Sequence, residues 1–207
     1  MTGSASRVVV LGIGNLLWAD EGFGVRCVEA LQRGYVFEPE IRLVDGGTQG
    51  LYLLDLVQDA DRLLILDAID YGLTPGTLRV IEGDDVPRFL GAKKMSLHQT
   101  GFQEVLALAQ LTGRYPSEVV LIGCQPEELE DYGGSLRPVV KQALQAAVDE
   151  ALLVLRRWQI AARPREGDDD RDDPLALDIY ERGRPSADEA CRIGDARVIA
   201  QSPREGE

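Results

Sequence analysis

The stretch Val8–Val25, VVVLGIGNLLWADEGFGV, decides the fold. Its first four residues, VVVL, have the β-branched, apolar character of a parallel strand that is buried on both faces. Gly12 and Gly14 then permit a tight turn with unusual backbone angles. Two adjacent carboxylates, Asp20 and Glu21, follow where a helix is expected to begin. The stretch therefore predicts a strand, a glycine turn and a helix, which together open an α/β fold.

The same stretch is close to the G-x-G-x-x-G pattern of dinucleotide-binding folds, but Leu17 stands where the third glycine is needed. A phosphate site uses the amides and the positive dipole end of a helix N-terminus. Asp20 and Glu21 would repel a pyrophosphate there. The residues therefore favour a metal or catalytic loop. A nucleotide-dependent oxidoreductase is the disfavoured alternative, and a dinucleotide-binding assay would test it.

The composition limits the class of protein. The chain has 207 residues, a formal net charge of −13 and three cysteines. Its size suits one domain with its own core, and its acidity disfavours nucleic acid as a partner. We find neither an apolar stretch long enough for a bilayer nor a signal peptide, so we expect a cytoplasmic protein without a membrane partner. The cysteines are too few and too scattered for a disulfide framework or a Cys-based zinc site.

Strand-like and helix-like segments alternate up to about residue 158. We expect strands at 7–12, 41–45, 63–68, 77–81 and 118–123, and helices at 22–33, 51–59, 100–111 and 136–158. This order predicts an α/β fold with three layers, in which helices sandwich a twisted, mostly parallel sheet. Residues 1–162 would form this domain. Residues 163–207 would form an acidic tail of low order, disordered or only loosely docked, because they combine a charge run with little periodic apolar content.

In such sheets, ligands bind outside the carboxyl ends of the strands, and three strand-end segments carry candidate residues. The first holds Glu21 beside Asp20, the third strand ends at Asp67 with Asp70 beyond it, and SLHQTG holds the sole histidine, His98. Each residue alone also has a structural interpretation, as a dipole partner, a loop cap or a structural histidine. Together, two carboxylates and one imidazole suit a divalent cation with open positions for water or substrate.

Two further strand ends have less specific sequences. The second strand ends in Asp45, Gly46, Gly47 and Thr48, whose glycines would allow close approach of an extended ligand such as a peptide. A flexible turn in which the aspartate caps the next helix is equally compatible. Cys124 ends the strand EVVLIG and could be a nucleophile, but we interpret it as a buried apolar residue because the chain has no second histidine.

Five segments, in this order and spacing, resemble the nickel–iron hydrogenase maturation endopeptidases: GIGNLLWADEGFGV, VDGGTQG, LLILDAID, SLHQTG and IGCQPEELE. The resemblance covers roughly residues 7 to 160. It implies a twisted sheet sandwiched by helices. It also implies an enzyme that removes the C-terminal extension of the hydrogenase large-subunit precursor after nickel insertion. By motif, Glu21, Asp67 and His98 correspond to the family's metal-binding trio, and residues 45–48 to its DGGT loop.

These residues lead to an expected mechanism. The trio would engage nickel that the precursor already carries, and no organic cofactor is expected. A metal-polarised water would then attack the scissile carbonyl with Asp20 or Asp70 as general base. Alternatively, nickel only positions the peptide and a carboxylate activates the water unaided. A metal-sensing chaperone that docks on the same precursor without cutting it is the alternative from another class. We expect the protein to act as a monomer.

Overall fold

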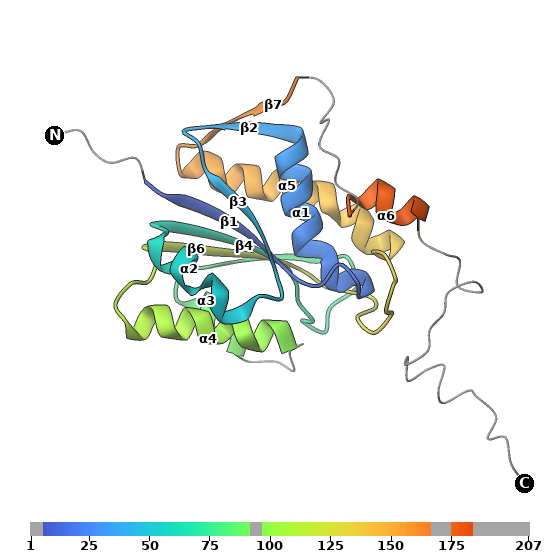
Figure 1. Cartoon of the computed structure of the whole chain (residues 1–207), viewed down its shortest axis with the longest axis horizontal. Helices are drawn as coiled ribbons and strands as arrows, with labels where there is room; N and C mark the ends of the chain where they lie inside the picture. The colour runs from blue at the N-terminus through green and yellow to red at the C-terminus, as the bar shows by residue number, and fades with distance from the viewer. Residues whose placement is uncertain (1–5, 92–96, 167–174, 184–207) are drawn as a thin grey trace, which may run out of the picture.

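The computed structural model describes residues 6–91, 97–166 and 175–183, and a five-stranded sheet runs through its centre (Figure 1). The strand order is β3-β1-β4-β6-β5. The strands are β1 (Val8–Ile13), β3 (Arg42–Gly47), β4 (Arg62–Ala68), β5 (Leu78–Glu82) and β6 (Glu118–Cys124). All neighbouring pairs are parallel except β5 with β6, which is antiparallel at one edge. The predicted mostly parallel sheet is confirmed.

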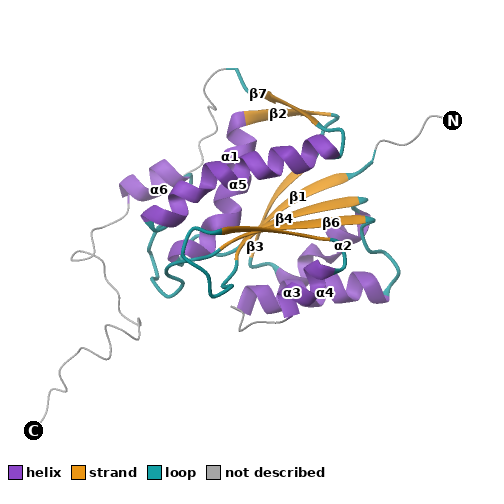
Figure 2. Ribbon diagram, turned by 180° about the vertical axis from the view of Figure 1, so that it is seen from behind, coloured by secondary structure: helices purple, strands orange, loops and turns teal. Residues whose placement is uncertain are grey.

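Helices cover both faces of the sheet, as Figure 2 shows. They are η1 (Ala19–Gly22), α1 (Phe23–Gly34), η2 (Gly50–Leu53), α2 (Leu54–Asp59), α3 (Asp85–Gly91), α4 (Leu97–Leu111), α5 (Pro138–Arg157) and α6 (Leu177–Gly183). One hydrophobic cluster joins α1 and α5 to the sheet, and a second joins α2, α3 and α4 to the other face. The three-layer architecture predicted from the sequence is therefore confirmed.

Burial on both faces explains why the sequence of β1 is apolar without alternation. Val8 and Val10 belong to the cluster under α1 and α5, whereas Val9 and Leu11 belong to the cluster under α2 and α4. Successive side chains of a strand point to opposite faces, so a strand covered on both faces needs apolar residues at every position. The same reasoning accounts for the fully buried residues 63–66 of β4.

Besides the short helix η1, the described residues contain four elements that the sequence analysis did not predict. These are α3, α6 and an antiparallel pair made of β2 (Tyr35–Glu38) and β7 (Ala161–Pro164). β7 extends two residues past residue 162, where the sequence analysis ends the domain. α4 begins at Leu97, three residues before the expected start. Within the described part of the tail, residues 177–183 form α6, which packs beside α1.

Among the described residues, no helix combines the length and the apolar character that a membrane crossing requires. The longest helix, α5, has 20 residues. It carries charged residues along its exposed side and two arginines in its last turn.

Candidate functional site

The carboxyl ends of β1, β3, β4 and β6 meet at one edge of the sheet, which we call the rim. The strand register sets this arrangement, because Gly12 lies opposite both Asp45 on β3 and Leu66 on β4, and Asp67 lies opposite Gly123 on β6. The loops that follow these four strands therefore start side by side. The rim is the place where ligands bind in open α/β sheets.

Glycines bring the loop after β1 back over the rim. Gly14 has a φ of +137°, and a Cβ there would lie 1.7 Å from the carbonyl oxygen of Glu21. At Gly24, in the first turn of α1, a Cβ would lie 2.0 Å from the carbonyl oxygen of Leu66. Only residues without a side chain permit these backbone contacts. The chain that carries Glu21 therefore returns to the end of β4, where Asp67 lies.

Glu21 lies half-buried at the rim. Burial raises the pKa of its carboxyl group to about 7, because removal from water penalises the charged form. A carboxyl group with such a pKa exchanges its proton near neutral pH. Perturbed groups of this kind are concentrated at functional sites.

Asp20, the neighbour of Glu21, is fully buried and takes a different role. Its Oδ2 accepts hydrogen bonds from the backbone amides of Glu127 and Glu128, both at 2.8 Å, and its Oδ1 accepts one from the amide of Arg137 at 2.7 Å. Charge-assisted bonds to amides are strong and fix the carboxylate in place. This geometry favours an anchor between the first loop and residues 127–137 over the general base suggested by the sequence.

Asp67 is 2 % exposed at the end of β4. The Tyr71 ring lies near it, over β6, and a Cβ at Gly123 would lie 2.0 Å from the tyrosine hydroxyl. Burial and, second, the charge of Asp67 raise the pKa of Tyr71 far above its usual value. Tyr71 is therefore a neutral hydroxyl beside the buried carboxylate. The sequence analysis missed it because its position depends on a glycine more than 50 residues later.

Asp70 is exposed and belongs to a loop that a buried glutamine organises. Its Oδ1 accepts hydrogen bonds from the amide of Gly72 at 2.8 Å and from Nε2 of Gln125 at 3.0 Å. The Gln125 Oε1 in turn accepts bonds from the amides of Tyr71 and Leu73. Gln125, at the end of β6, thus fixes the loop that follows β4. The sequence analysis did not single it out.

The DGGT loop is a tight turn joined to the first loop. The Asp45 Oδ1 accepts a bond from the amide of Gly47 at 2.9 Å, and the Gly47 carbonyl accepts one from the amide of Gly14 at 3.1 Å. Gly46 is buried against Leu11 of β1, while Asp45 and Thr48 are exposed. The turn geometry accounts for both glycines. Peptide binding by residues 45–48 stays a prediction.

His98 lies in the first turn of α4, and its side chain is outside the described residues. The beginning of α4 abuts η2, because a Cβ at Gly101 would lie 3.5 Å from the Cα of Gly50. Among the described side chains, no group of three His, Cys, Asp or Glu residues could hold a metal ion. The trio of Glu21, Asp67 and His98 includes an undescribed side chain, so it stays a prediction.

Comparison with known proteins decides the family. A family model described as hydrogenase maturation protease matches residues 25–154, more than half of the chain. The chain belongs to the hydrogenase maturation protease family. It is 65% identical over 199 residues to the hydrogenase expression/formation protein HoxM of Cupriavidus necator, covering 94% of this chain and 98% of HoxM. It is 40% identical to the hydrogenase 2 maturation protease of Escherichia coli, covering 77% of this chain and 97% of that protein.

The fold of this maturation protease agrees with that assignment. The solved structure of the hydrogenase maturating endopeptidase HybD from Escherichia coli superposes with a TM-score of 0.73 at 38% identity, over 77% of this chain and 98% of HybD. The resemblance inferred from the motifs is thus confirmed, and the protein is a hydrolase of the endopeptidase class.

Neither described cysteine of the maturation protease forms a nucleophilic site, and the third cysteine, Cys191, lies outside the described residues. Cys27 and Cys124 are free and fully buried. Burial, with a smaller contribution from the charge of Asp20, raises the pKa of the Cys124 thiol to about 12. A thiol with so high a pKa is almost fully protonated at neutral pH and is a poor nucleophile. The interpretation of Cys124 as a buried apolar residue is confirmed.

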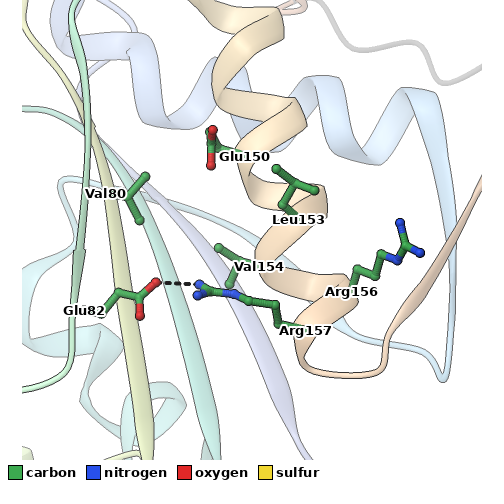
Figure 3. Close-up of a pocket in the computed structure, with 7 residues that line it drawn as sticks. All are labelled: Val80, Glu82, Glu150, Leu153, Val154, Arg156 and Arg157. Atoms are coloured by element: carbon green, nitrogen blue, oxygen red, sulfur yellow. Dashed lines mark hydrogen bonds and ion pairs between the residues drawn. The ribbon is translucent and has the colours of Figure 1, made fainter.

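The maturation protease also has a pocket away from the rim. It has a volume of about 640 Å³ and lies between β5 and α5 (Figure 3). Its lining residues are Val80, Glu82, Glu150, Leu153, Val154, Arg156 and Arg157. Glu82 and Arg157 form an ion pair across it. None of the candidate site residues lines this pocket.

Proposed function

We propose that this maturation protease removes the C-terminal extension of a nickel–iron hydrogenase large-subunit precursor after nickel insertion. The observation that carries the proposal is that the loop with Glu21 and the strand end with Asp67 lie at the same edge of the sheet. The backbone of Gly24, three residues after half-buried Glu21, packs onto the carbonyl of Leu66, the residue before buried Asp67. The start of α4, with the sole histidine, abuts the neighbouring element η2.

Nickel enters this proposal as part of the substrate. Glu21 and Asp67 offer oxygen ligands and His98 offers a nitrogen ligand, a mixed set that suits a first-row divalent metal. Carboxyl groups in low-dielectric surroundings gain from a nearby cation, so the raised pKa of Glu21 would fall when the metal approaches. A precursor without nickel lacks that attraction. The trio would thus let the protease distinguish loaded from unloaded precursor.

The chemical step of the proposal is hydrolysis of one peptide bond. The oxygen of a water adds to the scissile carbonyl carbon, the C–N bond breaks, and a proton goes to the leaving amine. A carboxylate near the rim takes the proton of the water. We assign this role to Asp70 over Asp20, because Asp70 is exposed and Asp20 is buried with both oxygens hydrogen-bonded to amides.

Exposed apolar side chains on both sides of the rim support a protein substrate. On η2, Leu51 and Tyr52 are 53% and 90% exposed. On the other side, Leu17 and Tyr132 are 42% and 49% exposed, and Tyr132 stacks edge-on against Trp18 with ring centroids 5.4 Å apart. Exposed aromatic residues beside a site are typical of surfaces that bind proteins.

Intact mass spectrometry of the cognate precursor tests the proposal. Nickel-loaded and nickel-free precursor would be incubated with the wild-type protease and with His98→Ala. We expect loss of a C-terminal peptide only from loaded precursor and only with the wild type. Cleavage of both forms would overturn the nickel requirement. Normal cleavage by His98→Ala would overturn the role of the trio, and a stable complex without any mass change would favour the chaperone alternative.

A further inference from the structure

The helix α6, within the C-terminal tail, touches the segment next to the site. A Glu181 oxygen accepts a hydrogen bond from the Ser135 hydroxyl at 2.8 Å, and the other carboxylate oxygen accepts one from Nζ of Lys141 at 2.6 Å. The Tyr180 hydroxyl donates to the carbonyl of Gly134 at 3.3 Å. Figure 1 shows α6 beside the beginning of α5, where these partners lie. The tail thus contacts residues 127–137, which we call the acidic segment.

The same stretch of the tail is anchored on α1. The Arg26 guanidinium is 4% exposed, pairs with Glu29 at 2.8 Å and donates to the carbonyl of Leu175. It also lies 5.5 Å from the centre of the Tyr180 ring. The Glu29 carboxylate accepts a further bond from the amide of Leu177 at 3.0 Å. Buried, charge-assisted contacts of this kind hold a short helix more firmly than exposed ion pairs do.

The acidic segment is held from its other side by the loop that carries Glu21. Asp20 accepts hydrogen bonds from three amides of the segment, and the Asp20 amide donates to the carbonyl of Glu128 at 3.1 Å. The amide of Gly133 donates to the carbonyl of Leu17 at 2.7 Å. The acidic segment therefore lies between α6 and the first loop and contacts both.

We propose that α6 is a positioning element that braces the acidic segment and, through Asp20, holds Glu21 in the site. The proposal rests on the proposed function for its effect on cleavage, but not for its effect on the acidic segment itself. Side chains that orient a reactive group through intermediate hydrogen bonds affect rate more than binding. Glu181 is the central residue of the brace because it binds both Ser135 in the segment and Lys141 in α5.

The test uses two variants of the full chain, each of which removes one carboxylate of α6. Glu181→Ala removes the contacts with Ser135 and Lys141. The matched control, Asp178→Ala, removes the ion pairs with Arg33 and Arg182 and leaves the acidic segment untouched. Hydrogen exchange at the amides of 127, 128 and 137 reports directly on the bonds to Asp20. Cleavage of nickel-loaded precursor, read as separate kcat and KM, reports on the site.

We expect Glu181→Ala to speed exchange of these three amides and to lower kcat about tenfold with KM unchanged, and the control to do neither. Equal changes in both variants, or unchanged exchange in Glu181→Ala, would overturn the proposal. Should Glu181→Ala fold poorly, Tyr180→Phe removes the single bond to Gly134 and must show the same pattern, smaller. Hydrogen exchange needs no substrate, so it tests the brace even if the wild-type protein does not cleave the precursor. Failure of the wild type to cleave would reject the proposed function only.

Discussion

The rim and the β5–α5 pocket lie at different parts of one sheet, and they differ in how their charges are held. At the rim, Asp67 is buried and Glu21 is half-buried with a raised pKa. In the pocket, Glu82 and Arg157 pair while 51% and 55% exposed, so water screens them (Figure 3). A buried charge destabilises the protein unless a partner compensates for its lost hydration, whereas an exposed charge keeps its hydration and is screened by water.

The prediction with the largest expected effect compares two variants, one of which removes a carboxylate at the rim and the other a carboxylate in the pocket. We expect Asp67→Asn to slow removal of the C-terminal extension at least about a hundredfold, because a neutral amide is a poor ligand for a cation. Glu82→Gln, in the pocket, should leave the rate unchanged. Intact mass spectrometry over time gives both rates. Comparable losses in the two variants would show that the rim has no special role.

Asp20→Asn tests the anchor beneath the rim. The asparagine side chain would place an amino group against backbone N–H donors, so we expect a loss of about 2 to 3 kcal/mol in the free energy of unfolding. Urea denaturation measures it. The exposed Glu82→Gln should stay within about 0.5 kcal/mol of wild type. An Asp20→Asn variant that is fully stable yet inactive would instead support the catalytic role suggested by the sequence.

Exposed leucines allow a matched test of where the precursor docks. Leu51 beside the rim and Leu153 in the pocket are 53% and 54% exposed. We expect Leu51→Ala to raise KM about fivefold, the effect of losing roughly 1 kcal/mol of interface contact, and Tyr52→Ala to raise it further. Leu153→Ala should leave KM unchanged. A larger effect at Leu153 would move the docking surface to the pocket.

The raised pKa of Glu21 predicts that this side chain lowers the free energy of unfolding of the precursor-free protease as the pH rises. Because the folded-state pKa exceeds the unfolded value, stability is lost as pH rises from about 4.5 to about 7. Glu21→Gln should therefore be more stable than wild type at pH 8, by about 1 kcal/mol or less after allowance for screening. The two should be equal at pH 4. Thermal unfolding at both pH values measures this, and an equal difference at both would reject burial of charge as the cause.

Thiol reagents provide the smallest expected effect. In a Cys191→Ser background, maleimide should neither label the native protease at pH 7.5 nor slow cleavage, because Cys27 and Cys124 are buried with raised pKa values. Unfolded protein is the positive control for labelling. Rapid inactivation of the native protease would reopen Cys124 as a nucleophile.

The parts of the site that could be predicted are those set by local sequence. Strand ends follow from apolar runs, and parallel strands bring their carboxyl ends to one edge, so the placement of Asp67 and Asp70 at the end of β4 was predicted, whereas their roles and that of Glu21 stay predictions. The role of Asp20 was not predicted, because the three amides that donate hydrogen bonds to it lie more than 100 residues away in the sequence. Gln125 was missed for the same reason, since an internal glutamine acquires its role only from the loop folded around it.

The helices that escaped prediction are short ones whose stability comes from tertiary contacts. α3 and α6 have seven residues each, which is too short to be stable in isolation. α6 depends on Arg26 and Glu29, which in the sequence look like ordinary surface charges of α1. The charge run that precedes α6 in the sequence dominates the composition of the tail. Composition therefore indicated low order and did not indicate the short helix that follows.

The contact of Gly24 with the carbonyl of Leu66 has a consequence for how this protein can evolve. The separation between the first loop and β4 is set by two backbones in contact, with no side chain between them. Mutations among exposed side chains around the rim can therefore adapt the protease to a different precursor without changing the separation of these two segments. One added methyl group at position 24 would push the two segments apart.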